Sequence, residues 1–147
     1  MNFTIKGLKT WSTYDAGGYQ FTLYRDGKKF AFVHNDGNGG PTDFHFADEP
    51  YFNDRGTYRK ELEDYCKTLP KWKGSDGEFR DTTPEIFAGE LVDDHLNAKK
   101  IARLRKSSIL FRLSSDNEEV IRMVKTLDMD LAKRILEKKY PGSYQFI

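Results

Sequence analysis

The feature that most constrains the fold of this chain is a glycine- and asparagine-rich run between two stretches of alternating aromatic residues. The run covers residues 34–41, and the flanking stretches are Phe30-Ala31-Phe32-Val33 and Phe44-His45-Phe46. Alternation with a period of two is typical of strands, and glycine and asparagine clusters are typical of the loops between them. The sequence therefore predicts a strand, a loop and a second strand. Because glycine adopts positive φ angles readily, the loop backbone can approach a ligand or partner closely.

A second turn signal, Asp26-Gly27, lies between residues 19–24 and residues 28–33. Asp-Gly suits the tight turns of β-hairpins because glycine accepts their left-handed geometry. Alternation divides the side chains of these strands between faces, with Tyr19, Phe21 and Leu23 on one and Phe30, Phe32 and His34 on another. Residues 1–48 are expected to form an antiparallel sheet of about three or four strands, with an aromatic face that requires cover.

Helices are expected to supply this cover. The first spans residues 54–68, where apolar side chains recur at spacings of three and four, and Asn53 or Asp54 is its expected N-cap. Residues 71–81, which follow, are polar and contain two glycines, so they predict an exposed connector.

The second helix opens with Thr83 as N-cap and Pro84 at the first helical position, where a missing N–H costs nothing. The third helix covers residues 129–139 after Asp128, which has the short acidic side chain of an N-cap. The second helix has apolar residues at helical spacing, and both helices are expected to pack against the sheet.

A later hairpin completes the expected fold. Residues 108–113 predict a strand, and residues 120–124 predict a strand that pairs back, with a helix over residues 118–127 as the alternative. The sequence as a whole predicts an α+β fold in a single domain, residues 1–147. In this fold an antiparallel β-sheet, made of the N-terminal strands plus the later hairpin, is packed by about three α-helices.

Composition favours a globular protein without a disulfide. The chain has 147 residues, enough for one domain with a substantial core, and 14% of them are aromatic. Its formal net charge is +1, whereas dedicated nucleic-acid binders usually carry a clear basic excess. Cys66 is the only cysteine and is expected to be a buried small hydrophobe. The N-terminal residues lack the features of a signal peptide, and no apolar run could span a bilayer, so we expect a cytoplasmic protein with no membrane partner.

Loop residues Asp36, Asn38, Gly39 and Gly40 form the first candidate binding site. Consecutive amides in a glycine-rich turn can converge on a negative group. No Lys-Ser or Lys-Thr pair follows, and a strand follows where a helix would be needed, so the loop is neither a P-loop nor a dinucleotide-binding fingerprint. An ordinary wide hairpin loop is the alternative interpretation.

His34 and His45 flank this loop and could face one another across it, with Asp36 and Asp43 close by. An imidazole beside a carboxylate can act as a general base or as half of a metal site. Surface histidines without such a role are the alternative, and the paired Cys and His ligands of a structural zinc site are absent from the sequence. Asp43 and His45 are therefore assigned as binding residues, and no catalytic residue, metal or cofactor is predicted.

A basic segment, residues 99–106, forms the second candidate site through Lys99, Lys100 and Arg103. With Arg112 and Arg122 it could face phosphate, and a strand that exposes aromatic and basic side chains at residues 108–112 would resemble a nucleic-acid stacking sheet. The alternative is that these cations complement the C-terminus of a helix.

The chain has more tyrosine and tryptophan than a core of this size needs, counting Tyr14, Tyr19, Tyr24, Tyr51, Tyr58, Trp11 and Trp72. Tyr and Trp are enriched at interface hot spots, so the surplus favours a protein-binding role, with a homodimer as one form of it.

Three N-terminal runs carry a resemblance to known proteins: Ile5-Lys6-Gly7-Leu8, Leu23-Tyr24-Arg25-Asp26-Gly27-Lys28 and Asn35-Asp36-Gly37-Asn38-Gly39-Gly40-Pro41. They resemble small accessory proteins carried by bacteriophages and plasmids, and residues 110–113 and 131–140 are similar to the C-terminal half of such proteins. The resemblance brings no catalytic residue. It implies a non-enzymatic protein that binds and inhibits a host or antiviral-defence protein.

Two alternatives remain open at the level of sequence. One is a nucleic-acid or nucleotide-binding protein that uses residues 99–106 or the loop at residues 36–41. The other is an enzyme centred on His34, His45 and the neighbouring aspartates.

Overall fold

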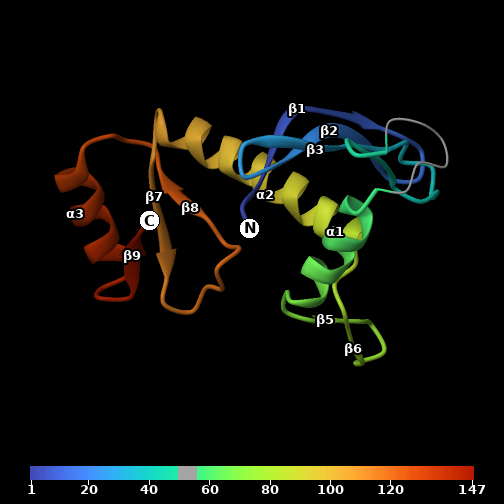
Figure 1. Cartoon of the computed structure of the whole chain (residues 1–147). Coiled ribbons are helices and arrows are strands. Elements are labelled where there is room, and N and C mark those ends of the chain that lie inside the picture. The colour runs from blue at the N-terminus through green and yellow to red at the C-terminus, as the bar shows by residue number, and fades with distance from the viewer. Residues whose placement is uncertain (50–55) are drawn as a thin grey trace. The chain divides into compact units, whose positions relative to one another are not determined.

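The computed structural model describes residues 1–49 and 56–147, and their contacts form two compact units. Unit 1 is Met1–Asp94 and unit 2 is His95–Ile147. Among the described residues there are three helices and antiparallel sheets of four, two and three strands, so the predicted α+β class is confirmed (Figure 1). The expected single domain, residues 1–147, stays a prediction, because two compact units can fold together or separately.

The sheet of unit 1 is a meander of four antiparallel strands in the order β1-β2-β3-β4. Its strands are β1 (Phe3–Ser12), β2 (Gly17–Arg25), β3 (Lys28–Asn35) and β4 (Asp43–Phe46). The predicted Asp26-Gly27 turn joins β2 to β3, with φ angles of 50° and 82° at the two turn residues. Positive φ at both positions is the geometry of a type I′ turn, which matches the twist of the two strands.

The expectation that Phe30, Phe32 and His34 share one face is wrong, because β3 contains a bulge. The pairing passes from Leu23 with Ala31 to Tyr24 with Lys29, so Phe30 is an extra residue in β3. Its side chain consequently turns to the core and is 1% exposed, whereas Phe32 is 37% exposed. A bulge shifts the alternation of side chains by one residue, which the sequence pattern of a single strand does not reveal.

The inner face of this sheet is covered by α1 (Tyr58–Lys67) and by the first turns of α2 (Pro84–Arg105) (Figure 1). Phe3 is central to the packing, since its ring lies 5.3 Å from Phe30, 5.0 Å from Tyr65 and 5.5 Å from Phe87 between centroids. The contacts with Phe30 and Phe87 are edge-to-face, an arrangement that adds to the free energy gained by burial. The buried members of the core are Phe21, Leu23, Phe30, Ala31, Val33, Phe46, Leu62, Cys66, Phe87, Ala88 and Val92.

The prediction of a buried Cys66 is confirmed, and burial raises the pKa of its thiol to about 11. Asn53 and Asp54, the expected N-caps of the first helix, lie outside the described residues. Asp48 caps α1 instead, because its Oδ2 accepts hydrogen bonds from the Thr57 and Tyr58 amides at 2.6 and 3.0 Å. These two amides lie at the start of the helix, where backbone N–H groups have no acceptor within the helix itself.

The segment between the two helices holds a small hairpin, β5 (Trp72–Lys73) with β6 (Phe79–Arg80), where the sequence predicts only a connector. Both strands are exposed, as expected for this segment. The predicted start of the second helix is confirmed, since Thr83 Oγ1 accepts from the Ile86 amide at 3.3 Å and the helix begins at Pro84.

Unit 2 contains the end of α2, β7 (Ile109–Leu113), β8 (Arg122–Val124), α3 (Met129–Lys139) and β9 (Tyr144–Phe146). The predicted later hairpin is present as β7 with β8, and it forms a sheet of its own in the order β8-β7-β9. The alternative helix over residues 118–127 is wrong. Asp128 caps α3 as predicted, since its Oδ1 accepts from the amides of Asp130 and Leu131 at 3.0 and 3.2 Å. None of the described helices combines the length and the apolar character needed to cross a membrane.

Candidate functional site

The glycine-rich loop, residues 36–42, is fastened to the turn between β1 and β2. Thr13 Oγ1 donates to the carbonyl of Gly37 at 2.6 Å, and Trp11 Nε1 donates to the carbonyl of Asp36 at 3.2 Å. A Cβ atom at Gly37 would lie 2.6 Å from the Gly18 nitrogen and 2.7 Å from the Gly17 carbonyl carbon. Gly37 also has a φ of +81°, so both the space and the backbone conformation require glycine at this position.

Two amides of this loop already have partners within the chain. The Gly37 amide donates to Asn35 Oδ1, and the Asn38 amide donates to Asp36 Oδ1, both at 2.9 Å. These are Asx turns, in which a side-chain oxygen accepts from the backbone amide. In an anion-binding nest, a bound anion would accept from such amides instead. Asp36 and Asn38 therefore stabilise the loop, while Gly39 and Gly40 are exposed. Ligand binding at these four residues stays a prediction.

The two histidines lie on the face of the sheet that points away from the core, called here the outer sheet face. His34 is paired across the strands with Asp43, and His45 is paired with Phe32. The two imidazoles are thus offset along the sheet and do not form a facing pair across the loop. His34 packs instead on Trp11, at 5.7 Å between ring centroids. Within residues 1–49 and 56–147 no group of three His, Cys, Asp or Glu side chains could hold a metal ion.

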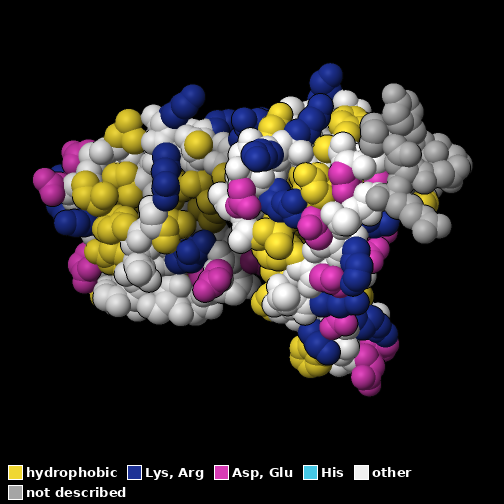
Figure 2. Space-filling view, viewed as in Figure 1, with side chains coloured by type: hydrophobic (Ala, Val, Ile, Leu, Met, Phe, Trp, Pro, Cys, Tyr) yellow, Lys and Arg dark blue, Asp and Glu magenta, His cyan; other side chains and the backbone are white. Residues whose placement is uncertain are grey.

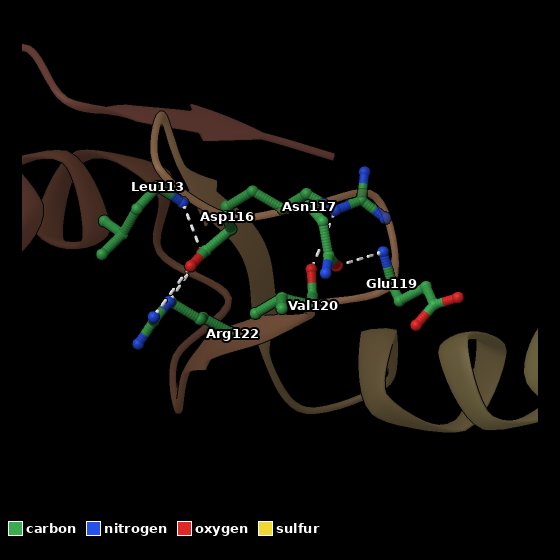
Figure 3. Close-up of polar contacts among 7 residues, drawn as sticks. Leu113, Asp116, Asn117, Glu119, Val120 and Arg122 are labelled. Carbon is green, nitrogen blue, oxygen red and sulfur yellow. Dashed lines mark hydrogen bonds and ion pairs between the residues drawn. The ribbon is translucent and has the colours of Figure 1, made fainter. Parts of the chain in front are cut away.

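The basic candidates Lys99, Lys100 and Arg103 are exposed on the second half of α2 and line a depression with Leu96. The two arginines expected to join them are engaged elsewhere. Arg112 donates to the carbonyl of Val120 at 2.8 Å and to that of Glu118, and Arg122 is paired with Asp116 (Figure 3).

The expected stacking surface on residues 108–112 is also wrong, since Leu110 is 2% exposed and Phe111 is 5% exposed. Side chains that fill a core cannot stack on bases. The sequence prediction assigned the aromatic side chain of this strand to the surface, whereas β7 is the central strand of its sheet.

The Asp116–Arg122 pair fixes the turn region between β7 and β8 (Figure 3). Arg122 binds Asp116 through Nε at 2.7 Å and Nη2 at 2.9 Å, and the Leu113 amide donates to the same carboxylate at 2.8 Å. The hydrogen bonds from the guanidinium lower the pKa of Asp116 to about 2. Such two-point contacts hold an arginine in one orientation.

Arg122 belongs to a groove that the sequence did not reveal, called here the α3–β8 groove. It has a volume of about 390 Å³ and is lined by Phe111, Arg122, Met123, Val124, Lys125, Ile135, Leu136, Lys139 and Tyr140. Three of these side chains are cationic and none is a carboxylate. Met123 and Ile135 are each 41% exposed within it.

Further apolar side chains of unit 2 are exposed, namely Leu127 (64%), Met129 (42%) and Leu131 (38%). Figure 2 shows hydrophobic side chains gathered over α3 and the neighbouring strands, with Lys and Arg among them. The signal in the sequence was the pair of adjacent apolar residues at 131–132 and again at 135–136. Such pairs give α3 a wide apolar stripe. Only Ala132 and Leu136 of this stripe are buried, so the rest of it is open to solvent.

No family model, curated protein or solved structure matches this chain. The geometry of its surfaces therefore carries the functional argument. Two amides of the glycine loop are already paired within the chain, whereas the α3–β8 groove leaves apolar and cationic side chains open to a partner.

Proposed function

We propose that the chain is a non-enzymatic binding protein whose α3–β8 groove receives an acidic, apolar segment of a partner protein. One observation carries the proposal: the described residues that line the groove combine apolar side chains with three cationic ones and include no carboxylate. Apolar surface that stays in water is a source of binding free energy, about 25 cal/mol for each Å² that a partner covers.

The floor of the groove favours a segment with its own apolar side chains. Met123 and Ile135 stand at its two sides, one on β8 and one on α3, and both are about two-fifths exposed, at 41%. A groove lined by exposed methionine and isoleucine side chains resembles the grooves in which amphipathic helices bind through their apolar face. Leu127, Met129 and Leu131 extend the apolar surface beyond the lining itself.

The charge of the lining favours acidic residues in that segment. Arg122 is already paired with Asp116, so Lys125 and Lys139 supply the charge that remains for a partner. Neither lysine forms an ion pair with another residue in the described part of the chain. Carboxylates beside the apolar residues of a partner would complement these lysines and would speed the encounter.

The resemblance to phage- and plasmid-borne accessory proteins supports a partner among host or antiviral-defence proteins. The chain would inhibit this partner by binding the partner's acidic, apolar segment. We place this complex in the cytoplasm, in keeping with the single cysteine, which is a free and buried thiol. The proposed role requires a stoichiometric complex and no turnover.

Affinity capture from bacterial lysate tests the proposal when it is done with matched variants. The tagged full chain, its Ile135→Glu variant and its Leu96→Glu variant are compared with nuclease present. Ile135 and Leu96 are equally exposed, at 41%, and both are helical, but only Ile135 lines the groove. We expect one protein in near-stoichiometric amount with the wild type and with Leu96→Glu, and its loss with Ile135→Glu.

Two outcomes would contradict the proposal. Equal capture by Ile135→Glu and by the wild type would place the partner on another surface. A purified protein that is dimeric by light scattering and becomes monomeric on Ile135→Glu would show that a second copy of the chain fills the groove.

A nucleic-acid-binding role for Lys99, Lys100 and Arg103 is the second candidate, since all three are exposed and form no ion pair among the described residues. Binding through such cations would weaken steeply with added salt. The double variant Lys100→Glu with Arg103→Glu should then abolish retention on a nucleic-acid column, and unchanged retention would refute this role.

A further inference from the structure

The outer sheet face of unit 1 carries two parallel rows of side chains across its four strands. Pairing across the strands aligns Lys6, Thr22, Phe32 and His45 in one row and Lys9, Gln20, His34 and Asp43 in the next. Each row thus begins with a lysine on β1, continues with a neutral hydrogen-bonding side chain on β2 and reaches a ring on β3. Residues directly opposite one another in an antiparallel sheet place their side chains on the same face.

The rings on this face form two tilted pairs, with interplanar angles of 33° for Phe32 with His45 and 36° for His34 with Trp11. Phe32 lies 6.3 Å from His45, and His34 lies 5.7 Å from Trp11 of β1, between ring centroids. Phe32 is 37% exposed and Trp11 is 36% exposed, although both are large apolar side chains. Trp11 is also held in place, since it lies over Gly18 and its Nε1 donates to the Asp36 carbonyl at 3.2 Å.

On β2, β3 and β4 the two rows lie two residues apart, which is about 6.8 Å along a strand. Successive nucleotides of an extended single strand cover a similar distance. On β1 the two lysines are three residues apart, because the pairing with β2 shifts register between them. Exposed aromatic rings on a sheet, with cations at one side, are the means by which several RNA-binding folds stack unpaired bases.

The charges of the face are arranged for a phosphate backbone on the β1 side. Lys6 and Lys9 both lie on this strand, and the single carboxylate of the two rows, Asp43, lies at the opposite edge on β4. The net charge of +1 describes the whole chain and does not describe this face. Thr22 and Gln20 lie between the lysines and the rings, where a ribose would lie, and both can hydrogen-bond to a 2′-hydroxyl.

We propose that the outer sheet face binds single-stranded RNA, with bases stacked on Phe32 and on the Trp11–His34 pair and phosphates beside Lys6 and Lys9. This site is in unit 1 and is independent of the α3–β8 groove, which is in unit 2. It also differs from the basic segment of α2, so the three sites can be separated by single variants.

Fluorescence titration of the full chain tests the proposal. The Trp72→Phe background leaves Trp11 as the only tryptophan, and the probe is an oligouridylate of about eight nucleotides. We expect quenching of Trp11 on binding. Phe32→Ala should weaken binding about tenfold, because the loss of one stacked ring has an effect of this size. Phe79→Ala is the matched control, since Phe79 is 64% exposed on the β5–β6 hairpin, and it should leave the affinity unchanged.

The lysines are tested by the salt dependence of the same titration. Lys6→Gln with Lys9→Gln should reduce the slope of log affinity against log salt by about 1.4, since each phosphate contact to a single strand contributes about 0.7. Lys133→Gln with Lys138→Gln, which changes two exposed lysines of α3 outside the α3–β8 groove, should leave the slope unchanged.

Three results would overturn the proposal. The first is an absence of quenching or of any affinity for oligouridylate. The second is an affinity that Phe32→Ala and the Lys6 and Lys9 changes do not alter, with circular dichroism showing that the variants are folded. The third is equal or tighter binding of the oligodeoxyuridylate of the same length, which would remove the role given to the 2′-hydroxyl.

Discussion

The two units of this protein use their apolar residues differently. Unit 1 has a fully buried cluster, where Phe21, Phe30 and Leu62 are at most 1% exposed, and its exposed apolar side chains include the aromatic residues Trp11, Phe32 and Phe79. Unit 2 buries Leu110 and Leu136, yet it leaves Met123, Leu127 and Ile135 at 41% exposure or more. Both units therefore keep apolar side chains available for recognition, but those of unit 1 are aromatic rings beside a tightly packed core, whereas those of unit 2 are aliphatic side chains around a smaller core. Both tryptophans lie in unit 1, so their fluorescence reports on that unit.

The largest effect is expected from Phe30→Ala in the core of unit 1. Removal of a fully buried phenylalanine leaves a cavity, and we expect a loss of about 4 kcal/mol in the free energy of unfolding. Urea denaturation followed by tryptophan fluorescence measures it. A loss below about 1 kcal/mol would show that the core is not as tightly packed as its exposed fractions indicate.

The glycine loop gives the next effect through a matched pair of changes. Gly37→Ala should cost about 3 kcal/mol, from a strained positive φ and from contacts with the backbone of Gly17 and Gly18. Gly39→Ala has a similar φ, +83°, but open space around its Cβ, so it should cost only about 1 kcal/mol. Equal costs, measured in the same urea experiment, would mean that the loop is not packed on the β1–β2 turn.

Asp116→Asn tests unit 2 through its pH dependence. The pKa of Asp116 is lowered to about 2 by Arg122, against about 3.9 in an unfolded chain. Its carboxylate therefore stabilises the fold above about pH 4, and this contribution is lost as the pH falls from there through 2. Amide hydrogen exchange of β7 and β8 should show a difference between wild type and Asp116→Asn at pH 6 that shrinks toward pH 3. A difference that does not change with pH would contradict the ion pair.

The smallest effect on stability is expected from Ile135→Ala in the groove. Because Ile135 is 41% exposed, this change should cost at most about 1 kcal/mol, although it removes part of the proposed binding surface. Amide hydrogen exchange of α3 is the measurement. A loss as large as that of Phe30→Ala would make Ile135 a core residue and would end the contrast between the two units.

The sequence predicted those elements whose signals are local. The Asp26-Gly27 turn, the Thr83-Pro84 start of α2 and the Asp128 cap of α3 each depend on a few adjacent residues, and all three are present. Strand β9 was missed because it has three residues and is held by pairing with β7, which lies far away in the chain. The hairpin of β5 and β6 was missed for a similar reason, since each strand has two residues.

The candidate sites were harder to predict, because exposure is a property of the folded chain. The face on which Phe30 lies depends on a bulge set by the pairing with β2. Arg112 and Arg122 look like free cations in the sequence, but the turn between β7 and β8 supplies their acceptors. The α3–β8 groove was missed because the wide apolar stripe of α3 resembles that of any packed helix until the part it buries is known.

The most direct test of the account is the affinity of the full chain for two synthetic peptides, measured by fluorescence anisotropy. Both peptides are amphipathic helices with leucine on one face, and they carry glutamate or lysine on the other. We expect the glutamate peptide to bind to wild type and to Leu96→Glu, Ile135→Glu to abolish this binding, and the lysine peptide not to bind. Equal binding of both peptides, or binding that survives Ile135→Glu, would contradict the claim that the α3–β8 groove receives an acidic, apolar segment.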